Sequence, residues 1–76
     1  MEINDFIKNF ANQFDDTDPS EIQAETNFRE LDEWSSLVAL AVLNMIAKKY
    51  EVKLSPDEMR TVSVVKDLFA LVQSKK

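Results

Sequence analysis

The chain has 76 residues, a formal charge of −5, and no cysteine, histidine or glycine. These counts exclude a disulfide framework, a Cys/His zinc site, a Ser–His or Cys–His nucleophile pair and a glycine-rich phosphate loop. An excess of 14 acids over 9 bases argues against binding to the phosphate backbone of nucleic acid. We therefore predict one domain over residues 1–76, with no metal site, that does no chemistry alone.

Residues 2–14 are predicted to form the first helix, because their apolar side chains recur at helical spacing. The stripe comprises Ile3, Phe6, Ile7, Phe10 and Phe14, and a stripe of this width is typical of a core-facing side.

Residues 15–35 show little periodicity, which predicts a long loop, and a loop of this length in a small domain is often functional. A short helical turn is expected at residues 19–22, with Asp18 as its cap and Pro19 at its first position. The apolar residues expected to anchor the loop on the core are Ile22, Phe28, Leu31 and Trp34.

Residues 36–50 are predicted to form the second helix. Its expected buried line consists of Leu37, Leu40, Leu43, Ile46 and Tyr50, with Val38, Val42 and Met45 to one side. This apolar arc is wider than a surface helix needs. It therefore indicates a central helix, or one with an apolar face for a partner or ligand.

Two further helices are predicted in the remaining chain. Ser55 and Pro56 have the residue types of a helix cap and first position, which indicates a short third helix at 56–60. Residues 61–65 are rich in β-branched side chains and are expected to be extended. Residues 65–75 form the predicted fourth helix, with an apolar face of Leu68, Phe69, Leu71 and Val72. The predicted fold class is all-α: a small four-helix bundle with a long first loop and a short third helix.

No membrane-spanning or targeting segment is expected. The longest apolar-rich stretch, residues 37–47, is well short of the about 20 residues that a spanning helix needs. The N-terminus lacks the basic and apolar regions of a signal peptide. We expect a cytoplasmic monomer without membrane insertion.

Two adjacent serines, Ser35 and Ser36, stand where the long loop meets the second helix. One interpretation is structural, because a serine oxygen at this place accepts a hydrogen bond from a helix amide, worth about 1 kcal/mol. The other is covalent modification, because a helix N-terminus favours the negative charge of a phosphodiester. A modified serine here would depend on another enzyme for its activation.

Together with features elsewhere in the chain, this junction resembles that of acyl carrier proteins. The residues that carry the resemblance are Phe28 and Leu31, the run Trp34-Ser35-Ser36-Leu37, Tyr50, the helix start Pro56-Asp57-Glu58 and the segment Val62-Ser63-Val64-Val65. Their spacing covers nearly the whole chain. Two positions differ from the family pattern, since Ser35 stands in place of an aspartate, and Glu33 or Trp34 in place of a glycine.

The resemblance implies a bundle of the acyl-carrier type with 4′-phosphopantetheine on Ser36 and with Ser35 and Leu37 as motif neighbours. The arm would come from coenzyme A through a phosphopantetheinyl transferase, and its thiol would hold acyl groups as thioesters. Acyl-loading and acyl-transfer or condensing enzymes would then use it, in fatty-acid or polyketide biosynthesis or another specialised pathway. The chain would be a carrier and not an enzyme. The residues expected to line an acyl pocket are Leu40, Val42, Ile46, Val62 and Leu68.

The distribution of charge favours basic partner surfaces. Residues 1–33 carry a net charge of −8 and residues 34–76 a net charge of +3, and an acidic field speeds encounter with basic surfaces. The second helix lacks the acids that the family usually shows, so we expect a more apolar interface. The predicted partner-facing residues are Glu33, Trp34, Val38, Ala41, Met45, Asp57 and Glu58; the Trp34 indole is also expected to pack on the core.

Three alternatives stay open at this point. The first is an aminoacyl or peptidyl carrier, and the second is a carrier fold that has lost its modification and works as an interaction module. Ser35 in place of aspartate motivates the second alternative. The third is an unrelated acidic helical bundle that acts as an inhibitor or adaptor.

Overall fold

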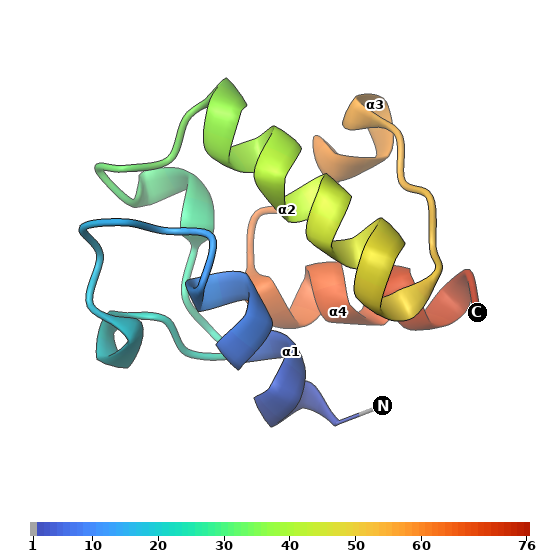
Figure 1. Cartoon of the computed structure of the whole chain (residues 1–76), viewed down its shortest axis with the longest axis horizontal. Helices are drawn as coiled ribbons and strands as arrows, with labels where there is room; N and C mark the ends of the chain where they lie inside the picture. The colour runs from blue at the N-terminus through green and yellow to red at the C-terminus, as the bar shows by residue number, and fades with distance from the viewer. Residues whose placement is uncertain (1) are drawn as a thin grey trace.

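The computed structural model describes residues 2–76, and within this range it contains four α-helices and no β-strand (Figure 1). The helices are α1 (Ile3–Ala11), α2 (Ser36–Tyr50), α3 (Pro56–Met59) and α4 (Val65–Ser74). Two 3₁₀ turns, η1 (Pro19–Glu21) and η2 (Phe28–Glu30), interrupt the long segment between α1 and α2. The predicted all-α bundle, with its long first loop and short third helix, is confirmed. None of the helices in the described range is both long and apolar enough to cross a bilayer.

Aromatic side chains of α1 form the centre of the core. Phe6 packs against Tyr50 of α2 at 5.7 Å and against Phe69 of α4 at 5.4 Å between ring centroids. Phe10 lies 5.5 Å from Phe28 of η2. Because aromatic pairs at these separations add to the energy of burial, α1 joins both longer helices and the loop into one hydrophobic core.

The long loop is fixed to the start of α4 by main-chain hydrogen bonds. The Phe28 N–H donates to the Ser63 carbonyl at 2.9 Å, and the Val65 N–H donates to the Thr26 carbonyl at 3.1 Å. The expected anchors Ile22 and Phe28 are buried, and Leu31 and Trp34 pack partly buried against the core. The loop is therefore an ordered part of the fold that leads directly into the start of α2.

The buried face of α2 differs from the predicted one. Leu37 is 81% exposed and Leu40 56% exposed, although both were expected to be buried. Val42 and Met45, which were placed to one side, lie in the core. Because α2 carries apolar residues on nearly every side, its spacing does not select a face. The packing of α2 into the core that it shares with α1, α4 and the long loop selects the buried face.

The ends of the helices follow local signals. Ser35 caps α2, Asp18 caps η1, and Ser55 caps α3. α1 ends at Ala11, three residues before its predicted end, although the main chain continues in turns that keep Phe14 buried. Residues 61–65 are not extended throughout, since Thr61 lies in a turn and only Val64 forms a bridge, with Asn27.

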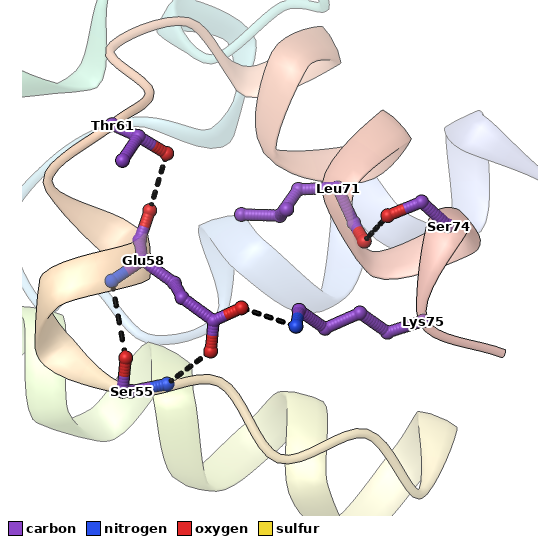
Figure 2. Close-up of polar contacts among 6 residues, drawn as sticks. All are labelled: Ser55, Glu58, Thr61, Leu71, Ser74 and Lys75. Atoms are coloured by element: carbon purple, nitrogen blue, oxygen red, sulfur yellow. Dashed lines mark hydrogen bonds and ion pairs between the residues drawn. The ribbon is translucent and has the colours of Figure 1, made fainter.

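The short helix α3 is capped at its start and linked to the residue after α4 (Figure 2). The Ser55 Oγ accepts from the Glu58 N–H, and the Glu58 carboxylate accepts from the Ser55 N–H, both at 3.1 Å. The other oxygen of this carboxylate pairs with the Lys75 ammonium, just after α4. The Lys75 contact and the Ser55 N–H, in that order, lower the pKa of Glu58 below its ordinary value. Glu58 therefore fixes the position of α3 beside α4.

Candidate functional site

The two serines at the start of α2 have different roles in the structure. Ser35 is the cap: its Oγ accepts a hydrogen bond from the Val38 N–H at 3.3 Å. Ser36 is the first residue of the helix, is exposed, and its hydroxyl has no hydrogen-bond partner among residues 2–76. The capping interpretation is confirmed for Ser35, which leaves the Ser36 hydroxyl available for chemistry.

The main chain at this point favours an anion. The first N–H groups of a helix have no partner within the helix, and at α2 the Ser35 side chain engages only that of Val38. The N–H groups of Ser36 and Leu37 are therefore oriented outward at the positive end of the helix dipole. A phosphate ester on the Ser36 oxygen would lie in a favourable electrostatic field.

Ser36 also lines an open groove of about 490 Å³ between α2 and α3, which we call the α2–α3 groove. Its wall on α2 includes Ala39, Leu40 and Leu43, which lie one and two turns after Ser36 on the same side of the helix. The complete lining is Arg29, Trp34, Ser35, Ser36, Ala39, Leu40, Leu43, Pro56, Met59 and Arg60. A chain attached to Ser36 therefore starts within a largely apolar groove.

The predicted acyl-pocket residues lie in two different places in the structure, and their role as a pocket stays a prediction. Leu40 lines the α2–α3 groove, whereas Val42, Ile46 and Leu68 are fully buried in the core. Val62 is half-buried, packs against the core and does not line the groove. Val42 and Ile46 lie on the core side of α2, and Leu68 lies on the core side of α4. The spacing of residues 36, 39, 40 and 43 is the sequence signal that places these side chains together along the α2–α3 groove.

Several predicted partner-facing residues are buried, half-buried or bonded to other residues of the fold. Met45 is only 5% exposed, so it belongs to the core. Val38 and Ala41 are half-buried. Asp57 is exposed, but Glu58 is engaged with Ser55 and Lys75. The exposed apolar residues of α2 are Leu37 and Leu40 instead.

The Trp34 indole packs as expected. Its ring centroid lies 4.7 Å from that of Phe28 and 6.3 Å from those of Phe10 and Phe14. Trp34 is also part of the lining of the α2–α3 groove, whereas the three phenylalanines are not. Trp34 therefore connects the residues just before Ser36 to the core.

The Glu33 carboxylate fixes the loop ahead of the serines. It accepts hydrogen bonds from the N–H groups of Asp15 at 2.6 Å, Asp16 at 3.0 Å and Thr17 at 2.9 Å, and from the Thr17 hydroxyl at 2.8 Å. Burial of this carboxylate raises its pKa, but the four hydrogen bonds outweigh burial, and the pKa lies below its ordinary value. The Glu33 carboxylate therefore stabilises the loop at residues 15–17.

Acidic side chains gather on the surface next to this loop. They surround a shallow depression of about 580 Å³ and include Asp16, Glu21, Glu30, Asp32 and Glu33, together with Thr17 and Leu31. We call this surface the acidic face. No basic residue is part of its lining, so this face presents negative charge ahead of Ser36 in the chain.

On the other side of the site, Arg29 connects η2 to the end of α3. Its Nε–H donates to the Val62 carbonyl at 2.9 Å, and its Nη2 donates to the Met59 carbonyl at 2.8 Å. The guanidinium also lies 5.8 Å from the centre of the Phe28 ring. These contacts bring Arg29 to the α2–α3 groove, a placement that no sequence signal indicated.

Comparison with known families agrees with this geometry. Residues 5–72 match a protein-family model described as a phosphopantetheine attachment site. No curated protein and no solved structure gave a significant match. The matched range includes all the residues that line the α2–α3 groove.

Proposed function

Because the chain belongs to the family of phosphopantetheine-attachment domains, we propose that it is an acyl carrier protein that bears 4′-phosphopantetheine on Ser36. The observation that carries this proposal is the state of the Ser36 hydroxyl. It is exposed, lacks a hydrogen-bond partner in the described range, and lies at the start of α2 within the α2–α3 groove. Its neighbour Ser35 is occupied as the helix cap.

The residues at this site fit the arm. Ser36 Oγ is the atom of attachment, and the N–H groups of Ser36 and Leu37 stabilise the charge of the phosphodiester. When bound, the arm supplies a thiol that holds acyl groups as thioesters. The apolar side chains of Ala39, Leu40 and Leu43 contact the arm, and they shelter the acyl chain from water when the arm folds back along the groove.

The chain itself does not activate the serine. Ser36 Oγ must lose a proton as its bond to phosphorus forms and the nucleotide part of coenzyme A leaves. The groove lining contains no carboxylate, and the chain has no histidine. The phosphopantetheinyl transferase therefore supplies the base, and the protein acts as its substrate and not as an enzyme.

Two surfaces are proposed to meet partner enzymes. Leu37 and Leu40 offer exposed apolar contacts directly after Ser36, and the acidic face offers negative charge ahead of it. A transferase, loading enzyme or condensing enzyme with an apolar patch and a basic rim complements both. The carrier serves a specialised lipid or secondary-metabolite pathway, because its α2 is less acidic than the family pattern.

The role of the apolar contact is tested with a matched pair of variants. Leu37→Asp and Ala70→Asp each place one negative charge on an exposed helix position, the first beside Ser36 and the second on α4. Loss of a leucine contact that becomes buried in the complex with the transferase predicts about a tenfold or greater fall in kcat/KM of the transferase for Leu37→Asp. Ala70→Asp is expected to be loaded normally. An equal fall in both would point to net charge as the cause and not to the contact.

The carrier function itself is tested by intact mass. Co-expression with a phosphopantetheinyl transferase is expected to add one phosphopantetheine, and Ser36→Ala is expected to remove the addition. A wild-type mass that does not change would support the unmodified interaction module instead. Acyl and aminoacyl donors, offered to the loaded protein with their ligases, distinguish an acyl carrier from an aminoacyl or peptidyl carrier.

A further inference from the structure

Both arginines of the chain line the α2–α3 groove, and none of its seven lysines does. Arg29 and Arg60 are 31 positions apart in the sequence and come from η2 and from the residue after α3. No acidic side chain is part of the lining. In a chain of net charge −5, the groove that contains Ser36 is therefore locally cationic, in contrast to the acidic face.

The Arg29 guanidinium is held in place with donors to spare. An arginine has five N–H donors, and two of those of Arg29 bind the Val62 and Met59 carbonyls. No carboxylate among residues 2–76 forms an ion pair with it. Its remaining N–H groups are thus oriented by the main chain and are free for a ligand with two oxygens, which a guanidinium binds in parallel.

Arg60 adds a second guanidinium to the same groove. It pairs with Asp57 at 3.1 Å, but the two side chains are 74% and 88% exposed. An ion pair that is so open to water contributes little and exchanges readily. Arg60 is therefore available to a carboxylate that enters the groove.

The rest of the lining is apolar and begins at the attachment point. Ala39, Leu40, Leu43 and Met59 provide hydrocarbon contacts alongside Ser36. A ligand that matches this groove has an apolar chain and an anionic group with two oxygens.

We infer that the cargo of this carrier is an acyl chain that ends in a carboxylate, with the terminal carboxylate bound by Arg29 and Arg60 in the α2–α3 groove. The inference rests on the proposed carrier function, and it adds the chemical class of the cargo. The phosphodiester of the arm is the other anion near the site, but it is attached at Ser36, where the α2 N-terminus already provides N–H groups. Arg29 is anchored instead to the carbonyls at and after the end of α3.

The experiment measures the terminal carboxyl of a loaded cargo. A transferase of broad specificity loads the protein with adipoyl-coenzyme A labelled with carbon-13 at its free carboxyl, and intact mass verifies the loading. Carbon-13 NMR then gives the pKa of that carboxyl. We expect it to lie about 0.5–1 unit below that of adipoyl-pantetheine in solution, because adjacent guanidinium groups favour the charged form. The net charge of −5 alone would raise it.

Three variants assign the effect. Arg29→Gln and Arg60→Gln are each expected to restore most of the solution value, whereas Lys53→Gln removes the same charge outside the groove and leaves the shift intact. Circular dichroism checks the fold of Arg29→Gln, because this variant also loses two bonds to the main chain. Arg60, with an exposed side chain, provides the test if Arg29→Gln does not fold.

The possible outcomes separate the inference from the carrier function. Complete loading with an unshifted or raised carboxyl pKa overturns the inference and leaves the carrier function intact. A lowered pKa that persists in both arginine variants also overturns it. A third result would also overturn it: a phosphorus-31 chemical shift of the unloaded arm that changes in the arginine variants, together with a carboxyl pKa that does not change. The arginines would then bind the phosphodiester and not the cargo. Failure of the wild-type protein to accept any group refutes the carrier function, and the inference with it.

Discussion

Ser35→Ala and Ser36→Ala are expected to have opposite consequences, although they delete the same atom at adjacent positions. Ser35→Ala removes the acceptor for the Val38 N–H, so it lowers stability, and it leaves the attachment oxygen in place. Ser36→Ala removes a hydroxyl that has no partner within residues 2–76, so stability is retained and loading is abolished. The pair therefore separates the structural role from the chemical one.

The size of the effect follows from the geometry of the cap. Loss of a serine cap costs about 0.5–2 kcal/mol. The Ser35 bond, at 3.3 Å, is longer than the usual range for such bonds and is exposed, so a cost of about 0.5–1 kcal/mol is expected. In a domain of this length this corresponds to a fall in Tm of about 2–8 °C. Ser36→Ala is expected to stay within about 0.5 kcal/mol of the wild type.

Thermal unfolding followed by circular dichroism and intact mass after incubation with the transferase measure the two roles in the same samples. Ser35→Asp is the matched control, because aspartate caps a helix as well as serine does, and it also restores the residue of the family pattern. Normal loading of Ser36→Ala, or a stability loss in Ser36→Ala as large as that in Ser35→Ala, would refute the assignment of roles.

Three further predictions concern the core, the end of α2 and acid stability. Ile46→Ala leaves a cavity in the core and is expected to lower the free energy of unfolding, measured in urea, by about 2–5 kcal/mol. Leu40→Ala, at an exposed position, is expected to lower it by no more than about 0.5 kcal/mol. Similar values for the two variants would contradict the orientation of α2. Glu51→Gly is expected to raise Tm, because Glu51 ends α2 in the left-handed conformation, at φ 57°. Glycine relieves a backbone strain of about 1–2 kcal/mol there, which exceeds its entropic cost of about 0.4–1 kcal/mol. A lower Tm would disprove this. The contact with Lys75 and then the Ser55 N–H lower the pKa of Glu58 below its ordinary value of 4.5. The contribution of Glu58 to folding stability is therefore complete above pH 4.5 and is lost as the pH falls through the folded-state pKa. The urea midpoint of Glu58→Gln should therefore fall less steeply in acid than that of the wild type, and equal slopes would refute this.

The limits of the helices were predictable because they depend on neighbouring residues. Ser35 caps α2 at its predicted start, and Tyr50 is its last residue, as expected. The Ser55 and Glu58 pair starts α3 in the same way. A cap is a contact between residues two or three positions apart, so the sequence contains all the information that it needs.

The lining of the candidate site was only partly predictable. Ser36 and Leu40 lie on one side of one helix, and their spacing is visible in the sequence. Arg29 reaches the groove through bonds to carbonyls 30 and 33 positions away. Contacts over such separations depend on how η2 and α3 come together, and no local pattern encodes that.

The sequence alone determined the number of helices, their approximate limits, the two candidate serines and the exclusion of Cys/His chemistry. These properties depend on composition, on periodicity and on capping, all of which are local. The tertiary structure decided which serine caps α2, which of its leucines are exposed and which cations reach the groove. Burial depends on what covers a face: α2 is apolar on nearly all sides, and its packing into a core shared with α1, α4 and the long loop places Val42 and Ile46 inside and leaves Leu37 in water.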